Sequence, residues 1–155
     1  MADTKIKILY VDDEENNLFS FKATFRLKYQ VFLAIGASEA VKILDENPDI
    51  AVIITDQRMP NMTGVEFLES ILEKHPEPMR VLLTGYADIN AVIEAVNKGK
   101  IFHYLSKPWN EEELDFTITR AYDIYNQKTN EREMSEKLLK SNDQLEFLLR
   151  QKLIS

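Results

Sequence analysis

Polar side chains that could handle metal ions and phosphate follow four of the five short apolar segments of the chain. The first segment is followed by two acidic residues, the third by one, the fourth ends in threonine and glycine, and the fifth is followed by lysine: Asp12, Asp13, Asp56, Thr84, Gly85 and Lys107. In an open parallel sheet, ligands bind beyond the carboxyl ends of the strands. If these segments are parallel strands, the residues meet at one edge and form a binding site.

Three carboxylates that lie close together repel one another, which raises the pKa of at least one of them unless a cation intervenes. Mg²⁺ is the natural cation, because it prefers oxygen ligands, takes one or two carboxylates plus waters, and leaves positions for phosphate oxygens. The absence of cysteine disfavours zinc. With Mg²⁺ and Lys107 to neutralise the carboxylates, the site could accept a phosphoryl group, so the sequence predicts phosphoryl transfer.

Asp56 is the best candidate for the nucleophile, since a carboxylate can take up a phosphoryl group as an aspartyl-phosphate. It ends the central predicted strand, whereas Asp12 and Asp13 form the pair expected to hold the metal. Thr84 could donate its hydroxyl to a phosphoryl oxygen, and Gly85 would leave room for close backbone approach.

The elements that must position these residues alternate along the chain. Five short runs of apolar and β-branched residues are predicted strands: residues 7–11, 31–35, 50–54, 80–84 and 101–105. After each run, apolar residues recur at helical spacing, which predicts five helices. Thr63 with Glu66 and Asn110 with Glu113 have the spacing of a capping box, and Asp88 stands where an N-cap is expected. Together these signals indicate an α/β fold with a doubly wound, five-stranded parallel sheet.

The last predicted helix continues past Tyr125 into a polar segment without Gly or Pro. Within that segment, one set of residues follows an alternating four-three spacing: Met134, Leu138, Ser141, Leu145 and Leu148. The spacing predicts a coiled-coil seam of about two to three heptads, with a solvated helix as the alternative. We therefore expect one domain over residues 1–125 and a helical extension over residues 126–155 that links it to an effector or pairs with a second copy.

Composition excludes several classes of protein. The 155 residues include 19 basic and 26 acidic ones, which gives a net charge of −7, and 45% are hydrophobic, enough for one sizeable core. The acidic balance argues against direct nucleic-acid binding, because phosphate backbones favour clustered Lys and Arg. No cysteine is present for disulfides, and no apolar run reaches the roughly 18 residues of a membrane span. These features predict a cytoplasmic domain without a membrane segment.

In order and separation, the polar residues resemble the signature of the receiver domain of two-component response regulators. The resemblance rests on the acidic pair after the first strand, on Asp56 within Thr-Asp-Gln-Arg-Met-Pro-Asn-Met-Thr-Gly, on Thr84-Gly85 and on Lys107-Pro108. It covers roughly residues 5–125 and implies a flavodoxin-like fold with strand order 2-1-3-4-5. It also implies that Asp56 accepts a phosphoryl group from a phosphohistidine on a sensor histidine kinase or phosphotransfer protein, and that the domain is a switch that catalyses only its own phosphorylation and dephosphorylation.

The resemblance assigns ligands to the metal. Asp13 and Asp56 would bind Mg²⁺ directly, Asp12 would help through a water, and the backbone carbonyl of Arg58 would complete the protein ligands. Lys107 would pair with the phosphoryl group. The peptide bond between this lysine and Pro108 would be cis.

The resemblance also implies how the switch works. Thr84 would move toward the phosphate and Tyr104 would swing inward behind it, changing the face made by residues 88–98, the fifth strand and the fifth helix. Arg58 and Tyr86 occupy the positions that tune the lifetime of the phosphoryl group, and their bulk predicts slow loss. The helix around residues 16–25 would recognise the kinase, and a homodimer could form through the switching face or the C-terminal helix.

Two other functions fit parts of the sequence. A metal-dependent phosphohydrolase of the haloacid-dehalogenase type would need Asp-x-Asp, but Arg58 stands where its general acid should be. A degenerate receiver that serves only as a scaffold is disfavoured because every expected site residue is present. The chain would be either the amino-terminal piece of a longer regulator, which we favour, or a stand-alone regulator with a dimerising tail.

Overall fold

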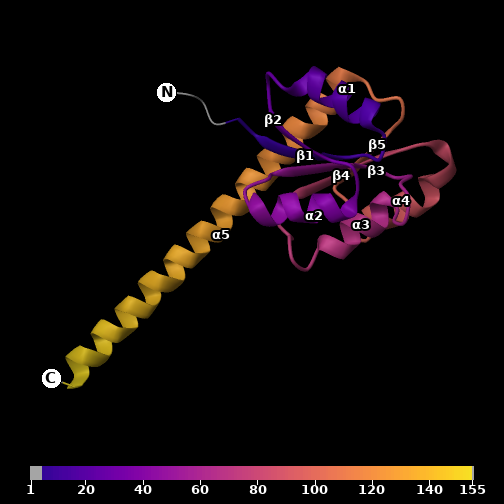
Figure 1. Ribbon diagram of the computed structural model, residues 1–155. Coiled ribbons are helices and arrows are strands. Elements are labelled where there is room, and N and C mark those ends of the chain that lie inside the picture. Colours follow the sequence, from indigo (N-terminus) through magenta and orange to yellow (C-terminus); the bar gives the residue numbers. More distant parts are fainter. Residues whose placement is uncertain (1–4, 155) are drawn as a thin grey trace. The chain divides into compact units, whose positions relative to one another are not determined.

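The computed structural model describes residues 5–154, apart from the side chains of Tyr86 and Ile154. The chain divides into two units, Met1–Tyr125 and Asn126–Ser155. In chain order, the elements are β1 (Lys7–Val11), α1 (Glu15–Phe25), β2 (Gln30–Ala34), α2 (Ala37–Glu46), β3 (Val52–Asp56), α3 (Gly64–Ile71), β4 (Met79–Thr84), the 3₁₀ turn η1 (Tyr86–Asp88), α4 (Ile89–Asn97), β5 (His103–Ser106) and α5 (Glu111–Ile154) (Figure 1).

All five strands run parallel in one sheet of order β2-β1-β3-β4-β5. This confirms the predicted doubly wound, flavodoxin-like fold. The strand order reverses between β1 and β3, where Leu9 is in register with Ile53. The carboxyl ends of these two neighbouring strands therefore lie side by side, at the point where open sheets of this kind bind ligands.

Helices cover both faces of the sheet in the first unit (Figure 1). On one face, α1 and the first part of α5 bury Leu18, Phe21, Phe25, Leu114, Ile118 and Ala121. On the other face, α2, α3 and α4 bury Ala40, Leu44, Phe67, Leu68, Ile71, Val92 and Ala95. Side chains of a strand alternate between the two faces, so Tyr10 joins the first cluster while Leu9 and Val11 join the second.

The predicted boundaries of the third strand are wrong by two residues, because β3 spans Val52–Asp56 and not residues 50–54. Ile50 and Ala51 are buried but precede the strand, so their apolar character marks burial and not membership of the strand. Thr55 and Asp56 are polar yet fully part of it. The acceptor candidate is therefore held by the sheet itself and not by the loop that follows. The fifth strand also begins later than predicted, at His103.

Helix starts agree with the sequence in part. Thr63 forms the predicted capping box with Glu66 at the start of α3, and the Asn110 side chain accepts a hydrogen bond from the Glu113 N–H at 3.2 Å. Asp88 does occupy the N-cap position of α4, but its side chain makes no capping hydrogen bond. Its carboxylate instead accepts a hydrogen bond from Arg58, because a guanidinium offers it a charged partner.

The second unit is helical, since α5 extends to Ile154. Its described apolar side chains are exposed, among them Met134, Leu138, Leu145 and Leu148, the apolar members of the predicted seam. The coiled coil stays a prediction. No helix within residues 5–154 is long and apolar enough to cross a membrane.

Candidate functional site

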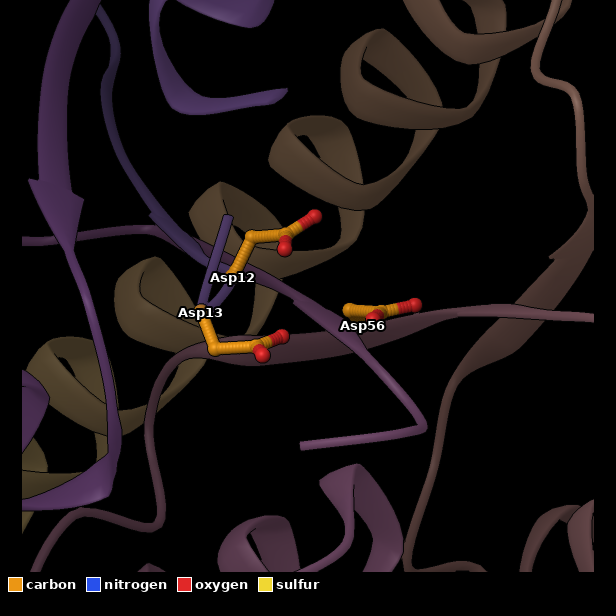
Figure 2. Close-up of side chains that lie close together, drawn as sticks. All are labelled: Asp12, Asp13 and Asp56. Atoms are coloured by element: carbon orange, nitrogen blue, oxygen red, sulfur yellow. The ribbon is translucent and has the colours of Figure 1, made fainter. Parts of the chain in front are cut away.

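Three carboxylates meet at the carboxyl edge of the sheet. Asp12 and Asp13 follow β1 directly, and Asp56 is the last residue of β3. One oxygen from each lies within 4.8 Å of the others, and Figure 2 shows the three side chains grouped together. The adjacency of β1 and β3 in the sheet brings about this grouping of residues that are far apart in sequence.

Asp56 is the most constrained of the three carboxylates. Its side chain is buried, with 4% of the residue exposed, and the Lys107 ammonium contacts its Oδ1 as an ion pair. That oxygen is buried and accepts no hydrogen bond from the described residues. Burial raises the pKa of the Asp56 carboxyl, the Lys107 ammonium works against this rise, and the Asp12 carboxylate adds to it. The Asp56 carboxylate is therefore held at this edge by its ion pair with Lys107.

Asp12 is fully buried and is held by three donors. Its Oδ1 accepts a hydrogen bond from the Glu14 N–H at 3.0 Å. Its Oδ2 accepts two, from the Tyr10 hydroxyl at 2.8 Å and from Asn17 Nδ2 at 3.1 Å. Burial and the nearby Asp12 raise the pKa of the Tyr10 phenol, which keeps it a donor. Sequence reasoning missed Tyr10 and Asn17, although the two-residue spacing of Tyr10 and Asp12 places both on one face of the strand.

Thr84 and Tyr104 lie on neighbouring strands beside this edge. Thr84 ends β4, is buried, and donates its hydroxyl to the Gly85 carbonyl at 3.2 Å. Its own carbonyl accepts a hydrogen bond from the Lys107 N–H at 2.9 Å. Tyr104 on β5 is half-buried and packs against the cluster beneath α2, α3 and α4. The switch role of both residues stays a prediction.

Arg58 lies two residues after Asp56, with 72% of its side chain exposed. Its Nε donates to Asp88 Oδ2 at 3.0 Å, which joins the loop after β3 to the start of α4. The backbone of Tyr86 belongs to η1, but its side chain lies outside the described residues, so its predicted role cannot be placed. The metal-ligand role of the Arg58 carbonyl stays a prediction as well.

Gln57 and Gly64 fix the loop after Asp56. Gln57 is buried, and its side-chain oxygen accepts a hydrogen bond from the Val65 N–H at 2.9 Å. Gly64 passes so close to Asp56 that a Cβ there would lie 2.4 Å from the Asp56 carbonyl oxygen and 2.7 Å from Leu82 Cδ1. The Lys107–Pro108 peptide bond is cis, as the resemblance implied. The packing around Asp56 therefore leaves no room for a side chain at position 64.

The donor set fits a hard divalent cation. It consists of carboxylate oxygens, the ligands that Mg²⁺ prefers. A cation beside Asp56 would also offset the repulsion between three neighbouring negative charges. The residues that would hold it are Asp12, Asp13 and Asp56.

The fold and the acidic edge define a receiver-type α/β signalling module, and comparison with known proteins identifies its family. The family model for the response regulator receiver domain matches residues 8–119. The chain belongs to this family. Receiver domains are regulatory modules that generally bind Mg²⁺ at an acidic pocket, the place that Asp12, Asp13 and Asp56 occupy here.

Among curated proteins, the chain is similar to the hydrogenase transcriptional regulatory protein HoxA of Cupriavidus necator. The two are 37% identical over 121 residues, which is 78% of this chain and 25% of that protein. The chain spans about a quarter of the length of the first curated relatives it matches.

Solved structures agree with the fold. A response regulator receiver domain protein from Clostridium thermocellum is 32% identical, with a TM-score of 0.74, covering 78% of this chain and 97% of that one. A crystal structure described as adenylate cyclase from Rhodopirellula baltica is 28% identical, with a TM-score of 0.83, covering 86% of this chain and 98% of that one.

Proposed function

We propose that this receiver is a phosphorylation switch whose acceptor is Asp56. The observation that carries the proposal is the edge at which Asp12, Asp13 and Asp56 gather while the Lys107 ammonium contacts Asp56. The phosphoryl donor would be a phosphohistidine on a sensor histidine kinase or a phosphotransfer protein. The domain would react once per signalling cycle and would not turn over a small-molecule substrate.

The chemistry follows from the residues. An Asp56 carboxylate oxygen attacks phosphorus, the phosphorus–nitrogen bond of the phosphohistidine breaks, and the bonding electron pair goes to the imidazole nitrogen. Asp13 and Asp56, with Asp12 and the Arg58 carbonyl, would hold Mg²⁺, which when bound would offset negative charge on the transferring oxygens. The Lys107 ammonium leaves the Asp56 oxygen and pairs with the phosphoryl group. The Thr84 hydroxyl stops donating its hydrogen bond to the Gly85 carbonyl and donates it to a phosphoryl oxygen instead.

The output would follow from that exchange. Movement of Thr84 would free space behind it for the half-buried Tyr104, and both residues lie on strands next to α4. The face made by α4, β5 and α5 would then differ between the two states. The surface of α1 is our candidate for recognition by the kinase.

We propose further that the receiver regulates a longer protein. This is supported by the relatives, of which the chain covers about a quarter. The exposed apolar residues of the second unit would pair with those of a second copy as a coiled coil. Since the 155 residues are acidic overall, they would not themselves contact nucleic acid.

The rival function, a phosphohydrolase of the haloacid-dehalogenase type, needs a general acid two residues after the nucleophile. Arg58 stands there in place of a carboxylic acid, and its guanidinium pairs with Asp88. A turnover assay with phosphate monoesters separates the two functions, because only the hydrolase would release phosphate continuously.

Intact mass spectrometry after incubation with acetyl phosphate and Mg²⁺ tests the proposal. The wild type should gain the mass of one phosphoryl group, whereas Asp56→Asn should not. Asp115→Asn is the matched control, because Asp115 lies in α5 and pairs with Lys28, away from the three-carboxylate cluster. A wild type that gains no mass would overturn the mechanism.

A further inference from the structure

The buried hydroxyl of Tyr10 is a feature that the phosphorylation chemistry does not by itself require. Tyr10 is 1% exposed and is the next-to-last residue of β1, among apolar residues of the α1 side of the core. A phenylalanine would fill the same space. The hydroxyl must nevertheless be hydrogen-bonded, because a buried polar group without a partner is costly.

The partner of this hydroxyl is Asp12, one of the three clustered carboxylates. The Tyr10 O–H donates to Asp12 Oδ2 at 2.8 Å. With Asn17 on the same oxygen and the Glu14 N–H on Oδ1, Asp12 accepts three hydrogen bonds. A carboxylate has about four lone-pair sites, so the direction left for a metal or its water is on Oδ1.

The phenol is itself held rigidly. Its ring stacks on Phe21 of α1 with centroids 4.2 Å apart and planes 9° from parallel. Phe21 in turn contacts Trp109 edge-on at 6.1 Å. Because the ring cannot move without disturbing this stack, the hydroxyl holds Asp12 Oδ2 in a fixed place.

We infer that Tyr10 is a positioning residue for the metal site: its hydroxyl fixes the Asp12 carboxylate so that Oδ1 faces the ion shared with Asp13 and Asp56. The inference rests on the proposed function, which places Mg²⁺ at these carboxylates. Hydrogen-bond partners of metal-binding groups orient those groups, and their loss typically costs about 10–100-fold in metal affinity.

Calorimetric titration of Mg²⁺ into the unphosphorylated protein tests this. Tyr10→Phe keeps the ring and removes only the hydroxyl, and we expect its Mg²⁺ affinity to fall about tenfold. Tyr29→Phe is the matched control, because Tyr29 is also buried in the α1-side core and its hydroxyl donates to Asp115, which is not in the cluster. Its affinity should equal that of the wild type.

Phosphorylation by acetyl phosphate gives a second readout. In Tyr10→Phe, the Mg²⁺ concentration for half-maximal rate should rise about tenfold while the rate at saturating Mg²⁺ stays near that of the wild type, since the acceptor is untouched. Circular dichroism and the fluorescence of Trp109, the only tryptophan, report whether the fold is retained.

The outcomes separate the two proposals. If the wild type binds Mg²⁺ and Tyr10→Phe binds it equally well, the role of Tyr10 is wrong and the proposed function stands. An equal loss of Mg²⁺ affinity in Tyr29→Phe would also overturn the role of Tyr10. It would mean that a general destabilisation of the core lowers the affinity. A wild type that binds no Mg²⁺ would overturn the metal site itself.

Discussion

Arg58 and Asp88 form an ion pair, Nε to Oδ2 at 3.0 Å, that connects the loop after β3 to the residue that precedes α4. The two residues are 30 positions apart in sequence. The pair holds the exposed Arg58 side chain toward the start of α4. The Asp88 carboxylate bonds to Arg58 and makes no capping hydrogen bond to the helix. A residue two positions after Asp56 is thereby tied to the N-cap of the helix that we expect to switch.

We predict that Arg58→Ala shortens the lifetime of the phosphoryl group severalfold, because water gains access once the tethered side chain is removed. Asp88→Ala should act in the same direction, since it releases Arg58. Stability should change by less than about 1 kcal/mol in both variants, as for other exposed ion pairs. Loss of the phosphoryl group can be followed by intact mass after acetyl phosphate is removed, with Mg²⁺ kept in the buffer.

Lys98→Ala is the control for this prediction, because it breaks an exposed ion pair with Glu94 of α4 that does not involve the loop after β3. Its phosphoryl lifetime should match that of the wild type. Unchanged lifetimes in both Arg58→Ala and Asp88→Ala would show that the ion pair does not limit access of water.

Gly64→Ala should destabilise the protein by about 1–3 kcal/mol, because the added Cβ meets the Asp56 carbonyl at 2.4 Å and the backbone must shift. Phosphorylation should fall as the acceptor moves. Gly36→Ala is the control: nothing lies within 4 Å of the added Cβ, and its effect should stay below about 1 kcal/mol. Urea denaturation measures both, and equal effects would refute the close approach at Gly64.

The raised pKa of Asp56 predicts how stability depends on pH without metal. Since burial raises the pKa of this carboxyl in the folded state, its contribution to stability is fully present below the unfolded pKa and is lost as the pH rises through the folded pKa. Asp56→Asn removes the buried charge. In EDTA it should be more stable than the wild type at pH 7, and the difference should shrink as the pH falls toward 4.

Asp115→Asn should change the stability at pH 7 in the opposite direction from Asp56→Asn. Burial would raise the pKa of Asp115, but hydrogen bonds from Lys28 and Tyr29 outweigh it and hold the pKa below its usual value. Its contribution is present above the unfolded pKa and is lost as the pH falls through the folded pKa. The variant should therefore be less stable than the wild type at pH 7. The same sign for both variants in urea denaturation would contradict this account.

The exposed helix of the second unit predicts self-association. Leu145→Lys places a charge in the predicted seam and should weaken a dimer by about tenfold or more, given the apolar area that a buried leucine removes from water. Phe147→Lys is the control, because Phe147 is equally exposed but lies outside the four-three spacing. Sedimentation equilibrium on the full chain measures both, and a wild type that stays monomeric would refute the coiled coil.

The topology was predictable because parallel strands covered on both faces are apolar almost throughout, as in residues 7–11. The ends of strands were less predictable. Ile50 and Ala51 are as apolar as the strand they precede, whereas Thr55 and Asp56 are polar residues inside it. Hydropathy indicates which residues are buried and not which residues belong to a strand. Two polar residues at the end of a buried strand are therefore not predicted to be part of it.

The site could be predicted as far as residue type and strand order determine it. Asp12, Asp13 and Asp56 come together because β1 and β3 are neighbours. The partners of these residues depend on side-chain directions that spacing does not give. Asp88 was predicted to cap a helix because it precedes an apolar run. Its carboxylate instead accepts a hydrogen bond from the guanidinium of Arg58.

The sheet separates Tyr10 from Tyr104. Tyr10, which holds Asp12, packs on the α1 and α5 side, while Tyr104 packs on the side of α2, α3 and α4. Substitutions in the layer of α2, α3 and α4 therefore need no compensating change in the stack of Tyr10 and Phe21 on the opposite side of the sheet. The α4 part of the proposed output face could then change during evolution while the hydrogen bonds that hold Asp12 are kept.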